Sequence, residues 1–539
     1  MALREEAANK QSNSGLYTSG KQSTKSMSTI AKGIVLVALS VVTTMRLFAS
    51  GDALPSLNPM ATNFVSVRVD TAHPGATISE NFLGLSFEMV SLLPDDNGRR
   101  YFYPGNQPLV NLFHTLGIKN LRIGGNTSDR DAVRLPDEAD IDSLFAFARQ
   151  AGVKVIYCLR LHHGSPAEAA KTAKYISDRY ADSLDCFSIG QEPSAYPSET
   201  VDQRPMSERM GGAAEHFPYS AYQAEWRRFA EAILQAVPDA KFCGPGVHNN
   251  PRWTRNFLSD FGQSNHLSLV TAHLYPGGPG GKVASPEIGR EQMLSGEFFG
   301  GYQKLLDGSM PSVRSNALPF RLEEANNFYN GGAKDVSDTY AAALWGLEFL
   351  HWWAAHGAAG INFHTGDRVA AGASLTPCRY SAFVTATNGN SARPLAYGIQ
   401  MFALGGAGNY LPVEITGDAP NLSVFATRAP AGQIYLSVIN KSEKHARLSV
   451  SFAGKANRPN QVETVELLGP TNFVANDQAV TIGGGQIQTD GNWSGQWQSL
   501  ETGNQSGLNL VVPPFSARIC KLKTAFAVNK PIKPKLEMD

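Results

Sequence analysis

The chain has 539 residues, of which 42% are hydrophobic and 17% are charged, and its 47 basic and 47 acidic side chains balance. This composition is typical of a globular protein, and the length predicts one large domain with a smaller companion, or three small domains. Zero net charge and the lack of a basic cluster in the folded part disfavour nucleic acids and heavily sulfated polymers as partners.

The N-terminal region has the pattern of a secretory signal peptide. Basic residues precede an apolar run of 13 residues at 33–45, and small residues follow it. That order is typical of an export signal, and the run is shorter than the roughly 20 residues that a membrane span needs. We assign residues 1–51 to a leader and signal peptide, with the signal at about 27–51. The mature protein is therefore expected to be secreted or periplasmic and free of the membrane; an uncleaved signal anchor is the alternative.

From residue 80 the sequence alternates short apolar runs with amphipathic helical stretches. Eight such runs predict an α/β fold, a (β/α)8 TIM barrel over residues 80–406. The predicted strands are 82–89, 120–125, 154–161, 186–192, 241–247, 268–275, 320–326 and 360–366. A doubly wound open sheet is the alternative, but no glycine-rich phosphate loop follows the first predicted strand.

After residue 406 the pattern changes to alternating apolar and polar residues separated by Gly, Pro and Asn turns. This pattern predicts an accessory antiparallel β-sandwich over residues 407–525. Residues 52–79 are also β-like and are predicted to join the sandwich. Residues 526–539 are predicted to form a loose tail.

Acidic residues lie at the ends of two strands on opposite sides of the predicted barrel. The active sites of such barrels form at the carboxyl ends of the strands. Glu192 ends the fourth predicted strand, and Glu323 and Glu324 lie in the seventh. Two carboxylates on either side of one bond are what glycoside hydrolysis requires. Strand alternation lets only one of Glu323 and Glu324 face the pocket, and the pattern does not choose between them.

Other polar residues at the strand ends complete the set of candidates. They are Glu88, Arg122, Asn126, Asp129, His162, His163, Gln191, His273, Tyr275, Asn362 and His364. The histidines lack the HExxH-type spacing of a metal site, so neither a metal nor another cofactor is expected. Five widely spaced cysteines predict buried thiols and not a disulfide framework.

Three stretches of the sequence together resemble glycoside hydrolase family 79, the family of β-glucuronidases and heparanases. They are "SIGQEPSAY", "FRLEEANNFYNGG" and "VSDTYAAALWGLEFLHWWAAHGAAGINFH". The resemblance extends over about residues 64–525 and is most specific after the seventh predicted strand. It implies a (β/α)8 barrel with its acids on strands four and seven, a carbohydrate substrate and no cofactor.

The resemblance also implies roles for single residues. Glu192 takes the position of the family's general acid/base, and Glu324 takes that of its nucleophile, which separates Glu324 from Glu323. Tyr329 and Gly331 match the residues that hold the uronic carboxylate in bacterial β-glucuronidases of the family. A phenol hydroxyl and a backbone N–H are suitable donors to such an anion.

Further positions match the family around these residues. Arg122 matches an arginine of the related enzymes that keeps the nucleophile ionised. Glu88 resembles an acid that contacts sugar hydroxyls, and Tyr275 matches a tyrosine near the nucleophile. The expected substrate-binding residues are Glu88, Asn126, Asp129, Gln191, Tyr275, Tyr329 and Gly331.

One residue departs from the family pattern. The family has Asn before the acid/base, and this chain has Gln191. In related enzymes that amide commonly binds the sugar 2-hydroxyl. One extra methylene can displace the contact by about 1 Å, which can cost roughly 100-fold in rate. The departure therefore predicts a shifted pocket, a slower enzyme or a compensating backbone, with both carboxylates retained.

The sequence as a whole predicts a retaining, exo-acting β-glucuronidase that hydrolyses terminal β-D-glucuronides by double displacement. Within enzymes, the alternatives are a β-glycosidase for a neutral sugar and a heparanase-like endo-glucuronidase. From another class, the alternative is a catalytically inactive carbohydrate-binding barrel. The lack of basic clusters favours a small exo-acting pocket.

Overall fold

The structure of the protein is a computed structural model. It describes residues 64–196, 217–366, 378–406, 408–419, 421–453, 459–475, 479–501 and 507–524. The predicted signal peptide and the predicted tail lie outside these residues.

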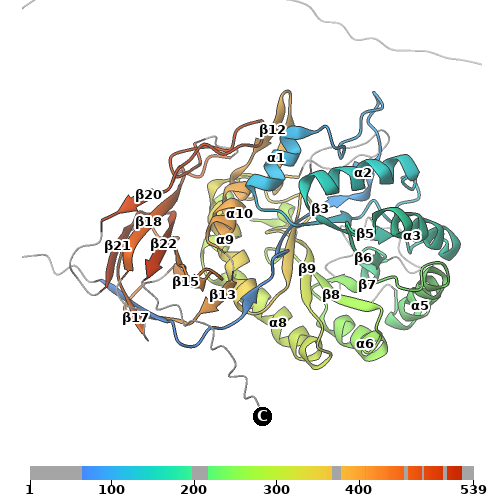
Figure 1. Cartoon of the computed structure of the whole chain (residues 1–539), viewed down its shortest axis with the longest axis horizontal. Coiled ribbons are helices and arrows are strands. Elements are labelled where there is room, and N and C mark those ends of the chain that lie inside the picture. The colour runs from blue at the N-terminus through green and yellow to red at the C-terminus, as the bar shows by residue number, and fades with distance from the viewer. Residues whose placement is uncertain are drawn as a thin grey trace, which may run out of the picture. The chain divides into compact units, whose positions relative to one another are not determined.

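Eight parallel strands close into a barrel with the order β10-β3-β4-β5-β6-β7-β8-β9 (Figure 1). These strands are β3 (Leu83–Glu88), β4 (Asn120–Gly124), β5 (Lys154–Leu159), β6 (Leu184–Ile189), β7 (Phe242–His248), β8 (Leu267–Leu274), β9 (Phe320–Ala325) and β10 (Gly360–His364). The predicted TIM barrel is confirmed, and each predicted strand overlaps one of these strands. A closed parallel barrel needs apolar residues on both faces of each strand, which is why the runs read as continuously hydrophobic.

Helices follow the strands and cover the outside of the barrel (Figure 1). Those described are α1 (Gln107–Thr115), α2 (Glu138–Ala151), α3 (Pro166–Tyr180), α5 (Tyr219–Ala236), α6 (Pro251–Phe261), α7 (Pro286–Leu294), α8 (Glu297–Ser315), α9 (Tyr340–Ala355) and α10 (Pro394–Leu404). Local sequence sets their ends: α2 begins after Asp137, which forms a capping box with Asp140, and stops at Gly152 with φ 67°. Ser165 caps α3 by accepting a hydrogen bond from the Glu168 N–H. Such caps satisfy the free N–H groups of the first turn.

A polar network fills the lower part of the barrel interior, which is the part near the amino ends of the strands. Arg321 is buried and donates to Asn362 Oδ1 at 2.9 Å and to the Asn81 carbonyl at 2.6 Å. Asn362 in turn donates to Asn120 Oδ1 at 2.8 Å. A Cβ atom on Gly84 would lie 2.4 Å from the Asn362 amide nitrogen, so only glycine fits there. Because these side chains fill the lower barrel, a ligand can enter only at the carboxyl ends of the strands.

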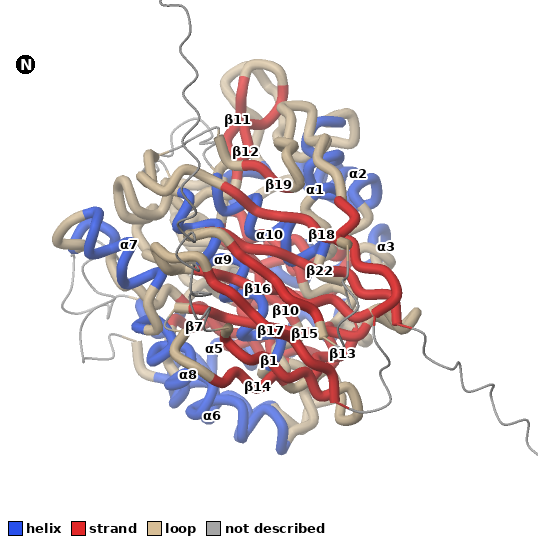
Figure 2. The backbone as a smooth tube through the Cα atoms, turned by 90° about the vertical axis from the view of Figure 1, so that its left-hand side faces the viewer, coloured by secondary structure: helices blue, strands red, loops and turns tan. Residues whose placement is uncertain are grey.

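Outside the barrel, two sheets form a β-sandwich (Figure 2). The predicted accessory sandwich is therefore confirmed. The smaller has the order β14-β1-β17-β21, and the larger has the order β19-β18-β22-β16-β15-β13-β2, with β20 paired to β18. Strand bounds are β1 (Val65–Asp70), β2 (Thr77–Ile78), β13 (Gly408–Leu411), β14 (Val413–Thr416), β15 (Leu422–Arg428), β16 (Ile434–Asn440), β17 (Ala446–Ala453), β18 (Pro459–Leu468), β19 (Thr481–Ile482), β20 (Gln498–Leu500), β21 (Leu508–Val512) and β22 (Ser516–Thr524). A further hairpin consists of β11 (Phe383–Ala386) and β12 (Gly389–Ala392). Strand β1 is parallel to β17 and antiparallel to β14, so an N-terminal strand lies inside the C-terminal sandwich.

Helix α9 joins the barrel to the larger sheet. The Tyr340 hydroxyl donates to the Leu467 carbonyl at 3.0 Å, and the His351 ring stacks on Phe425 with centroids 4.7 Å apart. Nearly all residues of α9 are buried, which explains why this helix is apolar on every side.

A buried ion pair also links α9 to the sandwich. Lys441 Nζ lies 2.6 and 2.7 Å from the two Glu348 oxygens, and the side chains are only 2% and 3% exposed. The Ser423 hydroxyl donates to the same carboxylate. Because the charges have left water, each depends on the other for compensation.

No helix among the described residues combines the length and the apolar composition that crossing a bilayer requires.

We predict that Glu348→Ala lowers the free energy of unfolding by about 3–5 kcal/mol, because Lys441 would be left buried without a counter-charge. Urea denaturation measures the loss. The double variant Glu348→Leu with Lys441→Met should recover most of it. The matched control is Asp178→Ala, which breaks an exposed pair with Lys174 and should cost less than about 1 kcal/mol. Equal losses of unfolding free energy in Glu348→Ala and Asp178→Ala would contradict the prediction.

Candidate active site

A buried guanidinium lies at the centre of the site. Arg122, on β4, donates to Glu324 Oε2 at 2.7 Å and to the Ser86 hydroxyl at 3.2 Å. Its second terminal nitrogen donates to Gln191 Oε1, and its Nε lies 3.9 Å from Glu323 Oε2. Burial alone would lower the pKa of Arg122, but Glu323 and Glu324 outweigh burial and raise it. The guanidinium is therefore a permanent charge that holds both acids.

Glu324 receives donors on both carboxylate oxygens. Arg122 and Gln191 Nε2 donate to Oε2, the latter at 3.1 Å, and the Tyr275 hydroxyl donates to Oε1 at 2.8 Å. Burial alone would raise the pKa of this carboxyl. The charges of His364, His273 and Arg122 outweigh burial and hold the pKa of Glu324 well below its usual range. Glu324 is thus an ionised carboxylate in a nearly water-free setting.

A β-bulge in β9 turns both neighbouring acids toward the barrel interior. Leu322 and Ala325 of β9 pair with Ile361 and Phe363 of β10, so β9 contains one extra residue. The pairing with β8 shifts at the same place. The expectation that alternation lets only one of the two acids face inward is therefore wrong, because the bulge breaks the two-residue period. Arg122 contacts both carboxylates, at 3.9 and 2.7 Å.

Glu192 follows β6 and faces the same interior. Its backbone is left-handed, with φ 45°, although a proline follows, and such a conformation costs about 1–3 kcal/mol. His273 Nδ1 donates to Glu192 Oε1 at 2.7 Å, and His273 Nε2 lies 3.6 Å from Glu323 Oε1. Burial alone would lower the pKa of His273, but Glu324 and Glu192 raise it to about 9. One oxygen of Glu192 and one of Glu324 lie within 4.8 Å of each other.

Glu88 lies at the end of β3 on the adjacent wall. It accepts hydrogen bonds from the Asn126 N–H at 3.2 Å and from the Thr127 N–H and hydroxyl at 2.8 and 2.6 Å. His364 Nε2 is 3.6 Å from its carboxylate. A Cβ atom on Gly125, whose φ is 71°, would lie 2.5 Å from this carboxyl group. Glycine at position 125 therefore lets the loop wrap around Glu88.

Asp129 lies behind the site and holds its loops. Its Oδ1 accepts from the N–H groups of Leu161 and His162, and its Oδ2 accepts from Gln191 N–H at 2.8 Å and from the Tyr196 hydroxyl at 2.5 Å. Four donors saturate the carboxylate. The structure thus gives Asp129 the role of positioning Gln191, whereas the sequence predicted contact with substrate.

The Gln191 amide is directed at the nucleophile candidate. Its oxygen accepts from Arg122 and one of its N–H groups donates to Glu324 Oε2. An amide nitrogen carries two N–H groups, so one is left for a ligand. The Gln191 side chain, which is one methylene longer than the family's Asn, therefore reaches Glu324 and keeps one N–H for a possible contact with a sugar.

Tyr329 and Gly331 lie on the loop after β9. The Tyr329 ring is half-buried, and both burial and the charge of Glu192 raise the pKa of its hydroxyl. Gly331 has φ 79°, and within the described ranges its N–H has no hydrogen-bond partner. The two residues thus carry, on one loop, a phenol hydroxyl and a backbone N–H that is unpaired within the described ranges.

Three histidines face the site, and two of them, His273 and His364, were candidates at the predicted strand ends. Their pairing with carboxylates is a tertiary feature that the sequence did not predict. His248 was missed because the predicted strand ended at residue 247, whereas β7 continues through His248. Its ring centroid lies 5.6 Å from that of Tyr329 and 5.8 Å from that of Tyr275.

Other candidates lie away from the site. His163 pairs with Asp131 at 2.8 Å on the surface, and Asn362 belongs to the network in the lower barrel. Among the described residues, one group has a geometry that could hold a metal ion: Glu192, His273 and Glu324. Its atoms already make the hydrogen bonds given above, and two further cationic side chains, Arg122 and His364, lie beside Glu324, so the site does not favour a cation.

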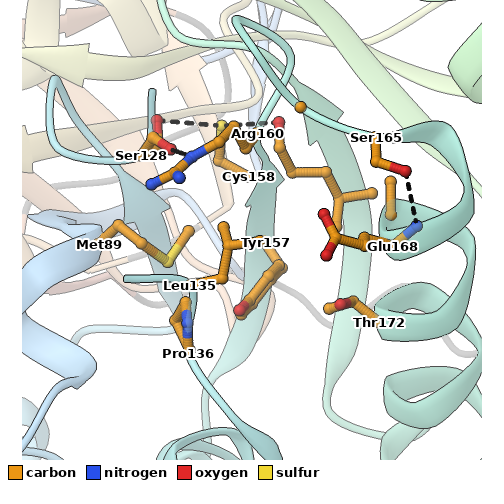
Figure 3. Close-up of a pocket in the computed structure, with 13 residues that line it drawn as sticks. Met89, Ser128, Leu135, Pro136, Tyr157, Cys158, Arg160, Ser165, Glu168 and Thr172 are labelled. Carbon is orange, nitrogen blue, oxygen red and sulfur yellow. Dashed lines mark hydrogen bonds between the residues drawn. The ribbon is translucent and has the colours of Figure 1, made fainter. Parts of the chain in front are cut away.

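A small cavity beside β5 is not an alternative site. Its volume of about 30 Å³ is enough for a single water molecule, and Met89, Tyr157, Cys158 and Glu168 are among its lining residues (Figure 3). Arg160 at its upper edge donates to the Ser128 carbonyl at 2.7 Å. This contact fixes the loop that carries Asp129.

Comparisons with known proteins support the resemblance found in the sequence. Residues 139–351 match the family model described as glycosyl hydrolase family 79, N-terminal domain. A curated β-glucuronidase of Aspergillus niger is 23% identical over 56% of this chain and 61% of its own length. The chain thus spans about three fifths of the length of that relative.

Solved structures share the fold. A 4-O-α-L-rhamnosyl-β-D-glucuronidase of Fusarium oxysporum has a TM-score of 0.61 at 18% identity, covering 85% of this chain and 100% of its own. An α-L-arabinofuranosidase of Thermotoga maritima has a TM-score of 0.60 at 14% identity, covering 85% and 99%. At these identities the structures support the fold alone. The family match and the curated relative confirm the predicted resemblance to family 79 and support the predicted class, a glycoside hydrolase.

We predict that the free energy of unfolding falls as pH rises from about 6.5, the ordinary pKa of unfolded histidine, to about 9, the pKa of folded His273. A raised pKa stabilises the fold fully below the unfolded value, and this contribution is lost as pH passes the folded value. His273→Gln should remove roughly 3 kcal/mol of that pH dependence. Urea denaturation at several pH values measures how the free energy of unfolding changes with pH. A variant of the exposed His114 should keep the wild-type slope, and an unchanged slope in His273→Gln would refute the prediction.

Proposed function

Starting from a glycoside hydrolase that matches family 79, we propose that the protein hydrolyses terminal β-D-glucuronides with retention of anomeric configuration. The observation that carries the proposal is the pair of carboxylates Glu192 and Glu324, with oxygens within 4.8 Å of each other. Retaining enzymes place their carboxyl groups about 5–5.5 Å apart, whereas inverting enzymes need about 6.5–9.5 Å for a water molecule. The short separation supports direct attack by one carboxylate.

Glu324 is the nucleophile in this proposal. Its Oε2 is occupied by donors from Arg122 and Gln191, whereas Oε1 accepts one hydrogen bond, from Tyr275. Oε1 therefore keeps a lone pair for attack on the anomeric carbon. The attack breaks the bond to the aglycone oxygen and forms a covalent glycosyl ester. The low pKa of Glu324 keeps it ready as an anion.

Glu192 is the general acid and then the general base. In the first step its carboxyl proton passes to the aglycone oxygen as the bond breaks. In the second step the carboxylate takes a proton from water, which attacks the anomeric carbon and releases glucuronate. His273 donates to Oε1 of Glu192, so the carboxyl oriented by this contact presents its other oxygen to the substrate.

Tyr329 and Gly331 supply selectivity for a uronic acid. The phenol hydroxyl and the free N–H would donate to the C5 carboxylate without neutralising it. The proposal of exo action rests on the lack of basic clusters along the chain. The predicted signal at residues 27–51 supports an exported enzyme.

We predict that Glu324→Gln lowers the turnover of p-nitrophenyl β-D-glucuronide by at least roughly 10⁴-fold, because the amide cannot form the glycosyl ester. Release of nitrophenol measures it. Glu192→Ala should lose roughly 10²–10⁴-fold on glucuronides with poor leaving groups and much less on the dinitrophenyl glucuronide, which needs no proton. Near-wild-type rates in Glu324→Gln would overturn the assignment. Glucuronide binding without turnover by the wild type would instead favour a carbohydrate-binding protein.

We predict that Tyr329→Phe lowers kcat/KM about 10-fold or more for the aryl glucuronide, since a hydrogen bond to a charged group is lost. The aryl β-D-glucoside, which lacks the carboxylate, should change less than about threefold. The control Tyr103→Phe removes the hydroxyl of an exposed tyrosine and should alter neither substrate. Equal losses on both substrates in Tyr329→Phe would refute a role in carboxylate binding.

A further inference from the structure

His248 differs from the other two histidines that face the site. His273 and His364 lie beside carboxylates, which outweigh burial and raise the pKa of each. The Nδ1 atom of His248 is buried and has no hydrogen-bond partner in the described part of the chain. Among the described residues, no group therefore holds a proton on this nitrogen or accepts one from it, and a ligand can pair with it.

The position of His248 places it on the wall that the proposed carboxylate contacts share. Its ring packs edge-on against Tyr329 at 5.6 Å and lies 5.8 Å from Tyr275. The charged groups that act on it are Glu192, which follows β6, His273 on β8 and Glu324 on β9. Burial is the main cause that lowers the pKa of His248, so the free site holds it neutral near pH 7.

Near pH 7 the charged groups that pair around Glu324 balance when Glu192 is in its proton-donor form; Asp129, behind the site, is not one of them. Burial alone would raise the pKa values of the other acids, but nearby cationic and hydrogen-bonding groups lower them, so those acids are ionised. The negative groups are Glu88, Glu323 and Glu324, and the positive groups are Arg122, His273 and His364. A uronate would therefore bring a fourth negative charge into a buried site. Such a charge is costly unless a partner compensates it.

We propose that His248 is a specificity-determining residue that binds a proton together with the substrate and pairs with its uronate carboxylate. This inference rests on the proposed function and names the group that balances the substrate charge. A carboxylate bound at Tyr329 would lie beside the imidazole, and an opposite charge at about 4–6 Å favours the protonated ring. A neutral glycoside brings no charge, so His248 would stay neutral beside it.

Binding of a glucuronide is then linked to pH. Below the pKa of His248 in the free enzyme the ring is charged before binding, and affinity is highest. Between that value and the higher pKa in the complex, affinity falls as pH rises, because a proton must be taken up. Above the higher value affinity is low and constant. KM for the glucuronide should therefore rise with pH over this interval, and KM for the glucoside should not.

The test uses the full chain with p-nitrophenyl β-D-glucuronide and β-D-glucoside. His248→Gln should raise KM for the glucuronide roughly 10–100-fold at low pH and abolish its pH dependence, with less than about threefold change for the glucoside. Calorimetry with phenyl 1-thio-β-D-glucuronide in buffers of different ionisation enthalpy should detect proton uptake by the wild type and none by the variant. His248→Lys should keep the preference for the glucuronide without the pH dependence, which also covers the case in which the glutamine variant fails to fold.

Two controls sharpen the outcome. His163→Gln removes an exposed histidine and should behave as the wild type. Arg379 is the rival counter-charge, because its backbone N–H donates to the Gly331 carbonyl at 2.5 Å. Loss of glucuronide preference in Arg379→Gln but not in His248→Gln would overturn the inference, as would unchanged proton uptake in His248→Gln. Failure of the proposed function gives a different result: the wild type itself would not prefer the glucuronide.

Discussion

Burial of the Arg122 guanidinium is the constraint on which the site depends. A cation inside a barrel is stable only if anions and acceptors surround it, and Glu323, Glu324 and Gln191 supply them. The bulge in β9 is what brings two consecutive acids to the same charge. Ionisation of Glu324 is therefore a property of the folded barrel and needs no ligand, so the proposed nucleophile is an anion before substrate arrives.

Much of the fold and part of the site could be predicted from the sequence, because both rest on local patterns. The hydrophobic runs and the helical stretches between them predict a barrel, and Glu192 and Glu324 lie where barrel enzymes place their chemistry. The resemblance to a family assigned the nucleophile position to Glu324, a choice that periodicity left open. The residues of such a site that a sequence can predict are thus those at the carboxyl ends of its strands.

The remainder depends on register and on partners far apart in the chain. A two-residue period predicted a choice between Glu323 and Glu324, but the bulge is set by pairing with β8 and β10, which no short stretch encodes. Asp129 has the residue type of a ligand contact, yet its donors come from residues 161, 162, 191 and 196. His248 lay one residue beyond a predicted boundary, where such predictions are least certain.

The position of β1 in the smaller sheet has a consequence for the order of folding. Thr71, just after this strand, hydrogen-bonds to Ala453, 382 positions later in the chain. In topological terms the barrel is a long insertion between the first strands of the sandwich and the rest of it. The sandwich can be completed only when the last strands have been synthesised, so it closes a very long loop and forms late. A chain truncated after the barrel would leave β1 and β2 as unpaired edges, which are exposed templates for aggregation.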